Sequence, residues 1–124
     1  IAYTVIGDSV NVASRIETLT RRYEVPILVS ESTRNECQDI LFREIDTVHV
    51  KGKHNATRLF QPSCSVSDSN ADMDNWLLKH KRALEAYNNS DSETAIKEFK
   101  TLRTMRPKDG YYSAMIKIME VSIV

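Results

Sequence analysis

An amide and a guanidinium stand four residues apart near the start of the chain, where the sequence predicts a helix. They are Asn11 and Arg15, within a predicted helix from about Val10 to Tyr23. Side chains four residues apart share one face of a helix. An arginine offers a planar fork of donors that suits a phosphate or a developing oxyanion. The spacing alone, however, favours the alternative of two ordinary solvated helix residues.

Two further positions carry polar groups at the ends of predicted strands. Thr4 lies in a strand predicted over Ile1–Ile6, and Lys51 begins the sequence Lys-Gly-Lys in a turn predicted over residues 51–55. Without further information, Lys51 reads as part of a solvated hairpin tip. Thr4 reads in the same way as a β-branched strand residue with no ligand.

These residues are held by a predicted order of strand, helix, strand, helix and terminal hairpin. Gly7, Asp8 and Ser9 supply a turn with good helix-capping residues between the first strand and the first helix. The later elements are a strand at Val25–Val29, a helix from Ser30 or Ser32 to about Asp39, and hairpin strands at Phe42–Val50 and Thr57–Gln61. Together, these strands and helices predict an α/β or α+β fold, with helices packed on one face of the sheet.

The amino-acid composition changes in the second half of the sequence. A stretch rich in Ser, Asp and Asn predicts a linker over residues 62–74, after a first domain over residues 1–61. Residues 75–124 are then predicted to be helical. The expected helices are Met73–Asn88, Asp91–Arg106 and Tyr111–Ile123. His80 lies on the apolar stripe of the first of them, which is typical of a packed histidine rather than a ligand.

Composition excludes several classes of protein. The 124 residues carry 17 basic and 17 acidic side chains, a balance that speaks against a nucleic-acid-binding arm. No stretch approaches the roughly 20 apolar residues that a membrane helix needs. The two cysteines and three histidines show no metal-binding spacing, so we expect no metal site and a reduced, cytoplasmic setting. The sequence begins with Ile rather than Met, and we expect it to be cut from a longer protein.

The sequence GDSVNVASR, following the strand YTVI, closely resembles the signature of the class III nucleotidyl cyclases, the adenylyl and guanylyl cyclase catalytic domains. Val25–Ser30 is similar to the strand that follows in that family, and Phe42–Lys53 is similar to its closing hairpin. The resemblance covers residues 1–61 in the family's order. It implies an α+β fold with part of the family's ferredoxin-like sheet, namely the C-terminal part of the catalytic domain.

The resemblance also implies roles for the four polar residues. In the family, a homodimer or pseudo-heterodimer binds the nucleotide at its interface, and the ribose 3′-hydroxyl attacks the α-phosphorus. Asn11 would orient the ribose and Arg15 would stabilise charge on the α-phosphate, while Lys51 would contact the terminal phosphates. Thr4 matches a Thr-type subgroup and favours ATP. Because a hydroxyl both donates and accepts, GTP stays open as the substrate.

The resemblance is incomplete at one end. The family's two metal-binding aspartates and its adenine-reading lysine lie upstream of the segment that matches, and Asp8 belongs to a turn rather than to a metal site. Two Mg²⁺ or Mn²⁺ ions would therefore be bound only in the longer parent protein. We expect the isolated chain to produce no cyclic AMP.

The helical segment has a looser resemblance. Ala83, Ala95, Phe99 and Pro107 fall at spacings similar to a tetratricopeptide repeat, although Tyr87 comes one residue late. Such a helical hairpin would bind a protein partner, support dimerisation, or simply pack on the first domain.

Three functions therefore stay open from sequence. The chain is part of an adenylyl or guanylyl cyclase, a catalytically silent cyclase-like domain that regulates or dimerises, or a helical adaptor. The intact Asn11, Arg15 and Lys51 favour the enzyme.

Overall fold

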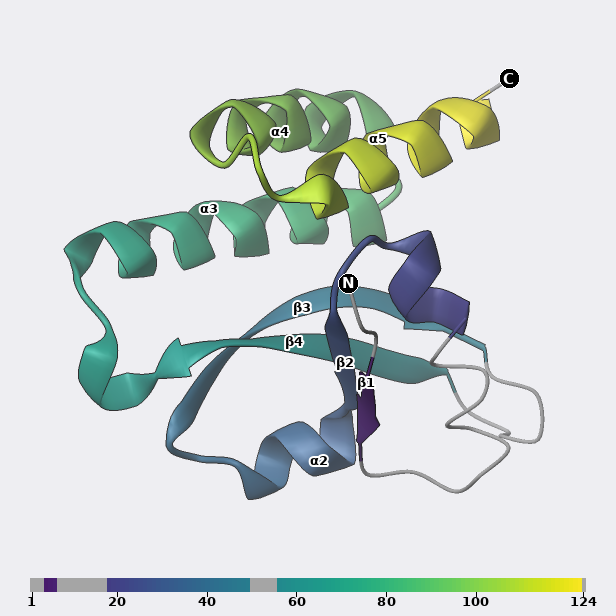
Figure 1. The fold of residues 1–124 in the computed structure, drawn as a ribbon. Helices are drawn as coiled ribbons and strands as arrows, with labels where there is room; N and C mark the ends of the chain where they lie inside the picture. Colours follow the sequence, from purple (N-terminus) through teal and green to yellow (C-terminus); the bar gives the residue numbers. More distant parts are fainter. Residues whose placement is uncertain (1–3, 7–17, 50–55, 124) are drawn as a thin grey trace. The chain divides into compact units, whose positions relative to one another are not determined.

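The computed structural model describes residues 4–6, 18–49 and 56–123 (Figure 1). The chain divides into two compact units, Ile1–Ser69 and Asn70–Val124. The first contains a mixed sheet with short helices and the second is helical, which confirms the predicted α+β class.

The sheet of the first unit has four strands in the order β1-β2-β4-β3. Strand β1 pairs in parallel with β2, whereas β2 pairs antiparallel with β4, and β4 antiparallel with β3. The strands are β1 (Thr4–Ile6), β2 (Ile27–Ser30), β3 (Ile40–Val48) and β4 (Thr57–Ser65). Sequence order therefore differs from spatial order, because β4 lies between β2 and β3.

The hairpin of β3 and β4 contains two irregularities in register. Ile45 is an extra residue on β3 between the pairs Glu44↔Phe60 and Asp46↔Leu59. Near the other end, Ser63 is extra on β4, next to Pro62. A bulge tolerates a proline that a regular ladder would not. This explains how β4 runs to Ser65 instead of ending at the predicted Gln61.

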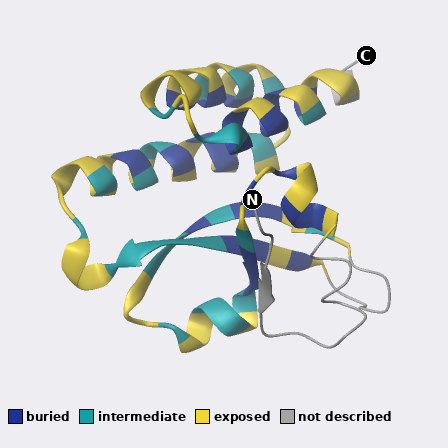
Figure 2. Cartoon of the chain, viewed as in Figure 1, coloured by how far each residue is buried: buried dark blue, intermediate teal, exposed yellow. Residues whose placement is uncertain are grey.

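The interior of the first unit is mainly apolar, and Figure 2 shows buried residues along its strands. Those that are buried on the described strands are Leu28, Val29, Ile45, Leu59 and Phe60. Leu19, Tyr23 and Val25 add to them from the segment before β2. Several apolar residues of the predicted strands thus lie in the core, whereas Ile27, Phe42 and Val48 are half-buried.

Residues 18–22 are helical, and the rest of the helix predicted over Val10–Tyr23 lies outside the described residues. This helix ends in a Schellman motif. Glu24 has a left-handed φ of 53°, and the Val25 N–H donates to the Thr20 carbonyl at 3.1 Å. A second helix, α2 (Glu31–Glu36), is capped by Ser30, whose hydroxyl accepts from the Thr33 N–H. It ends before the predicted Asp39.

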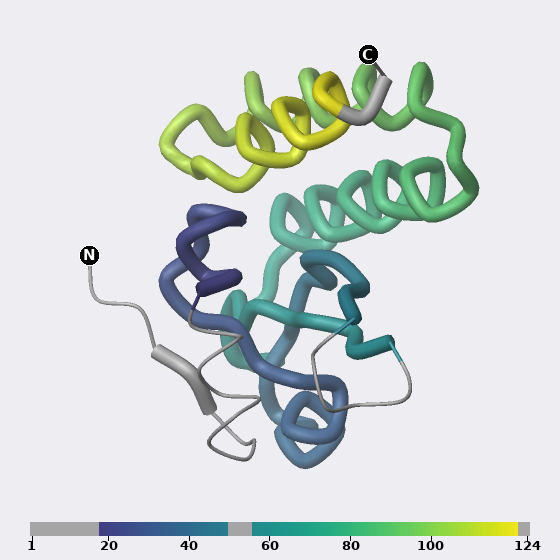
Figure 3. The backbone as a smooth tube through the Cα atoms, turned by 90° about the vertical axis from the view of Figure 1, so that its right-hand side faces the viewer, coloured from purple at the N-terminus to yellow at the C-terminus, as the bar shows by residue number. Residues whose placement is uncertain are grey.

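The second unit consists of α3 (Ala71–Asn88), α4 (Ser92–Met105) and α5 (Gly110–Ile123), which can be followed in Figure 3. Asn70 caps α3 and Asp91 caps α4 through side-chain oxygens. Between these helices Ser90 has a φ of 60°, and the Asp91 N–H donates to the Ala86 carbonyl at 2.9 Å. Asp91 thus closes one helix and opens the next.

The linker in the structure is shorter than the one predicted over residues 62–74. Residues 62–65 belong to β4, residues 66–68 form a single 3₁₀ turn, and α3 begins at Ala71. The polar residues that suggested a loop are instead caps and exposed turn positions. Ser65, for example, donates to Asp68 at 2.8 Å. Only residues 69 and 70 separate the turn from the helix.

The core of the helical unit is aromatic. Apolar residues recur in a stripe at helical spacing along each of α3 and α4, and these stripes are buried with the exception of the half-buried Tyr87. Their buried members are Trp76, His80, Ala83 and Leu84 on α3, and Ala95, Phe99 and Leu102 on α4. Tyr111 and Tyr112 on α5 are fully buried as well. No helix within the described residues is long and apolar enough to cross a membrane.

Candidate functional site

Three chain segments leave the sheet at the same end. The carboxyl end of β1, Ile6, pairs with Val29, and the carboxyl end of β2 pairs with Leu59 through Ser30. Because β4 runs opposite to β2, its first residue lies toward this same end. There Thr57 pairs with Val48, the last residue of β3. The segments after β1, after β2 and between β3 and β4 therefore all connect at one end of the sheet.

This end of the sheet is where the predicted site residues connect. Thr4 lies in β1 in register with Ile27, two residues before the strand ends. Asn11, Arg15 and Lys51 lie outside the described residues, and the structure does not place their side chains. The structure does bring together the strand ends that flank them. Ile6 precedes Asn11 and Arg15, whereas Val48 and Thr57 bracket Lys51.

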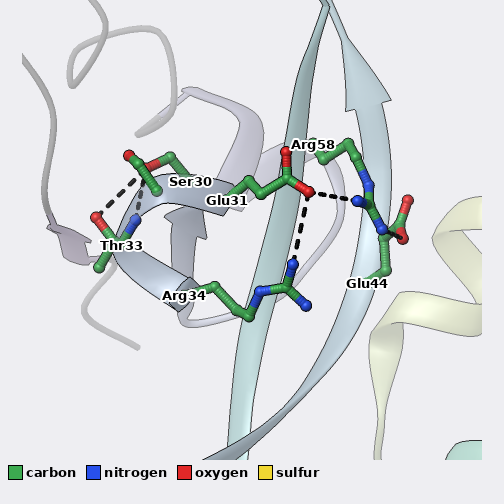
Figure 4. A network of polar contacts seen from close by, with 7 residues as sticks. Ser30, Glu31, Thr33, Arg34, Glu44 and Arg58 are labelled. Carbon is green, nitrogen blue, oxygen red and sulfur yellow. Dashed lines mark hydrogen bonds and ion pairs between the residues drawn. The ribbon is translucent and has the colours of Figure 1, made fainter. Parts of the chain in front are cut away.

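A polar network that sequence reasoning did not predict lies beside the same strand ends (Figure 4). The Arg58 guanidinium, on β4, donates to the carboxylate of Glu31 at the start of α2. Its other terminal nitrogen donates to Glu44 Oε1 on β3 at 2.7 Å. Arg34 Nη2 lies 3.5 Å from the same Glu31 oxygen. Glu31 thus contacts two arginines, Arg34 and Arg58, and Arg58 in turn contacts two carboxylates.

Both arginines lie close to one aromatic ring, that of Phe60. The guanidinium carbon of Arg34 lies 4.4 Å from the centroid of Phe60, and that of Arg58 lies 5.1 Å from it. Arg58 and Phe60 are two residues apart on a strand and share one face, and Glu44 pairs with Phe60 across the hairpin. The hydrogen bond to Glu44 is the largest influence on Arg58 and raises the pKa of its guanidinium. Because a guanidinium stays protonated in proteins, Arg58 is a permanent cation.

Part of this network could have been predicted from the sequence. Alternation along β4 places Arg58 on the face of Phe60, and the hairpin register would add Glu44. Glu31, however, follows β2, and only the placement of β2 beside β4 brings it to Arg58. That pairing joins residues 27 positions apart and leaves no local trace in the sequence.

Three polar contacts, one buried and two partly buried, lie in the sheet and the segment before β2. The Tyr23 hydroxyl donates to Asp46 Oδ2 at 2.7 Å, and the Thr47 N–H donates to Asp46 Oδ1 at 2.8 Å. Arg43 Nε donates to Gln61 Oε1 at 2.8 Å across the hairpin. Buried polar groups need such partners, and the bond between Arg43 and Gln61 joins two residues that face each other in the hairpin register.

His80 is a buried, hydrogen-bonded residue of the core of the helical unit. Its exposed fraction is 2%, and its Nδ1 lies 2.9 Å from the Tyr112 hydroxyl. Within the described residues, no group of three or more His, Cys, Asp or Glu side chains could hold a metal ion. Cys37 and Cys64 are both free thiols.

Comparison with known proteins relates the chain to proteins named adenylate cyclase. It is 52% identical over 62 residues to the adenylate cyclase of Anabaena cylindrica, an alignment that covers 47% of the chain and 12% of that relative. It is 37% identical over 60 residues to adenylate cyclase 1 of Rhizobium meliloti (strain 1021), covering 48% and 9%. The terminal-differentiation specific adenylate cyclase of Dictyostelium discoideum is 29% identical over 116 residues, covering 86% and 5%.

The chain thus spans between 5% and 12% of the length of these curated relatives. No protein-family model matches it. No solved structure matches it either.

Proposed function

We propose that the chain is part of a class III adenylyl cyclase that converts ATP to 3′,5′-cyclic AMP and pyrophosphate. The observation that carries the proposal is the agreement between the resemblance at GDSVNVASR and the names of the relatives. The sheet supports it, because the strand ends that flank Asn11, Arg15 and Lys51 lie at one end.

In this proposal the chain supplies the part of the site that faces the phosphates and the ribose. Asn11 orients the ribose so that its 3′-hydroxyl is in line with the α-phosphorus. Arg15 stabilises the negative charge that grows on the α-phosphate as the new bond forms, and Lys51 holds the terminal phosphates. Thr4, in β1, contributes to the choice of the base.

The two divalent cations of the proposed reaction find no ligand cluster among the described residues. In the proposal, the Mg²⁺ or Mn²⁺ ligands are aspartates that precede the matching segment in a longer protein. A second subunit would complete the site, as the interface position of the nucleotide in the family requires.

The helical unit has a separate proposed role. Ala83 and Ala95 are fully buried, as small residues are where two helices of a tetratricopeptide-like pair approach closely. We propose that α3, α4 and α5 form the beginning of such a region and serve a protein partner or dimerisation. The proposed setting of the whole protein is the cytoplasm.

Activity of matched proteins tests the catalytic proposal. The 124-residue chain and a version extended upstream of Ile1 through the whole catalytic domain are each incubated with ATP and Mn²⁺, and with GTP in parallel. We expect cyclic AMP from the extended protein alone and no cyclic GMP above background. Cyclic GMP as the main product would make it a guanylyl cyclase. An extended, folded protein with no product from either nucleotide would contradict the proposal and favour a silent cyclase-like domain.

A further inference from the structure

Helix α2 contains no apolar residue. It spans Glu31–Glu36 with the sequence Glu-Ser-Thr-Arg-Asn-Glu, and none of these residues is buried. A helix this short is not stable by itself in water, because the first turn is costly to form and most helical stability in proteins comes from packing. Since α2 buries no apolar side chain, hydrophobic packing is not what holds it against the sheet.

Charged side chains supply the contacts between α2 and β4 (Figure 4). Glu31 forms an ion pair with Arg58 of β4, and Arg34 Nη2 lies 3.5 Å from the same Glu31 oxygen. The Arg34 guanidinium also lies over the ring of Phe60, with its central carbon 4.4 Å from the ring centroid. The position of α2 therefore depends on charge.

These charged contacts are open to screening by salt. The side chains of Arg58 and Glu31 are 43% and 41% exposed, and that of Arg34 is 34% exposed. Ion pairs at such positions contribute little net stability and weaken as the ionic strength rises. Arg34 Nε, moreover, is shielded from solvent and has no hydrogen-bond partner within the described part of the chain. A donor left in this state is a cost of the docked position that opening would relieve.

The strands beneath α2 are held in a different way. Val29 and Phe60 are each only 3% exposed, and Leu59 is fully buried. The backbones of β2 and β4 pair at Val29↔Phe60 and at Ser30↔Leu59. Salt screens the interaction between exposed charges, whereas it does not screen the burial of apolar surface. A rise in ionic strength is therefore expected to loosen α2 before it loosens the sheet.

We propose that α2 is a flap that opens away from Phe60 while the sheet stays folded, and that ionic strength sets how often it opens. Local opening is typical of segments with few buried apolar contacts and exposed polar ones, and α2 has both properties. The open state lacks the ion pair between Glu31 and Arg58 and the contact of Arg34 with the ring. This opening does not require catalysis, so it is expected of a cyclase and of a silent cyclase-like domain alike.

Hydrogen exchange of the 124-residue chain tests the flap, because it measures opening at single amides. The probes are the N–H groups of Thr33 and Cys37, which donate to Ser30 Oγ and to the Arg34 carbonyl. After correction for intrinsic rates, they are expected to exchange more than about tenfold faster than the paired amides of β3 and β4. In about 1 M NaCl the probes should exchange about threefold faster again, with little change on β3 and β4.

Three variants show whether charge holds the flap. Glu31→Gln removes the charge at nearly unchanged size, and should raise the exchange rate of the two probes about threefold in low salt and remove most of the salt effect. Glu36→Gln is the matched control on an exposed residue of the same helix, and should leave the rate unchanged. Arg34→Lys keeps the charge but loses the planar group over the aromatic ring, and should also raise the rate. The amides of β3 and β4 report in the same experiment whether each variant keeps its sheet.

Several results would overturn the proposal. If the probes exchange as slowly as the amides of β3 and β4, α2 opens only when the whole unit unfolds. Charge does not hold α2 if salt leaves the probes unchanged or if Glu31→Gln exchanges like Glu36→Gln. An Arg34→Lys variant that exchanges at the original rate would show that the contact with the Phe60 ring does not keep the flap closed. None of these results bears on the production of cyclic AMP by the extended protein, so failure of the flap and failure of the proposed function are separate outcomes.

Discussion

The indole N–H of Trp76 donates to the hydroxyl oxygen of Tyr112 at 2.8 Å and so joins α3 to α5. His80 Nδ1 lies 2.9 Å from the same oxygen. The Trp76 ring is covered in turn by Arg106, whose guanidinium carbon lies 3.9 Å from the ring centroid. One hydroxyl therefore satisfies polar atoms of two buried side chains on another helix.

Tyr112→Phe is expected to destabilise the helical unit by about 1–3 kcal/mol, because the Trp76 N–H loses this acceptor in a buried site. Urea unfolding measures the change through the fluorescence of Trp76, the one tryptophan in the sequence. Ser113→Ala, at an exposed position of the same helix, should leave the transition nearly unchanged. Equal midpoints for the two variants would show that the hydrogen bond contributes nothing.

Ala83→Leu is expected to destabilise the helical unit by about 1–3 kcal/mol, since added methylene groups overpack a filled core. Ala83 is fully buried on α3, which packs against α4. The same substitution at Ala71, exposed in the first turn of α3, is the matched control. Thermal unfolding followed by circular dichroism gives both values, and an unchanged Ala83→Leu would argue against close approach of the two helices.

Tyr23→Phe should cost the first unit about 1–3 kcal/mol by removing a buried donor from Asp46 Oδ2. Hydrogen exchange of the amides on β3 and β4 measures this loss without interference from the helical unit. Thr47→Ala is the control, because it removes an exposed side chain and keeps the N–H that donates to Asp46. Equal exchange rates in the two variants would contradict the prediction.

The coupling between Arg58 and Glu44 should not change between pH 7 and pH 10. The hydrogen bond to Glu44 raises the pKa of Arg58, and a raised pKa in a basic group means stabilisation that is lost only when the pH rises through that pKa. This range lies well below it. Unfolding free energies of Arg58→Ala, Glu44→Ala and the double variant give the coupling at each pH. In 1 M NaCl it should fall, because these side chains are partly exposed.

Arg15→Ala, in the protein extended through the catalytic domain, should reduce kcat about 10²- to 10³-fold with little change in KM for ATP. A group that acts mainly in the transition state affects turnover rather than ground-state binding. Lys51→Ala should instead raise KM more than it lowers kcat. Steady-state cyclic AMP production gives both constants, and a kcat of Arg15→Ala equal to that of the unaltered protein would remove its proposed role.

Local patterns predicted much of the secondary structure. Ser30 caps α2 as expected because its hydroxyl satisfies an amide in the first turn. The buried stripe of Trp76, His80, Ala83 and Leu84 follows from helical periodicity. The extension of β4 to Ser65 could not be anticipated, because the bulge at Ser63 that accommodates Pro62 depends on the partner strand.

Local sequence patterns could not predict the contacts between residues that are far apart in the sequence. The placement of β4 between β2 and β3 is what brings Glu31 to Arg58, and no periodicity encodes it. Tyr112 was expected on a helix, but its contacts with Trp76 and His80 depend on how α5 packs. Of the candidate site, the chemistry of Asn11, Arg15 and Lys51 came from the resemblance, and the structure adds the common end of the flanking strands.

The strand order also has a consequence for the order in which the strands pair during folding. Strands β3 and β4 are neighbours along the chain and share a long register, so their pairing closes a short loop. Among the residues that the structure describes, β2 pairs with β4 at Val29 and Ser30, and β1 pairs with β2. Since distant pairings carry a larger closure cost, the hairpin of β3 and β4 is expected to form before β2 joins β4. The strand ends that flank Lys51 would then be paired before the strand end that leads to Asn11 and Arg15 is joined to them through β2.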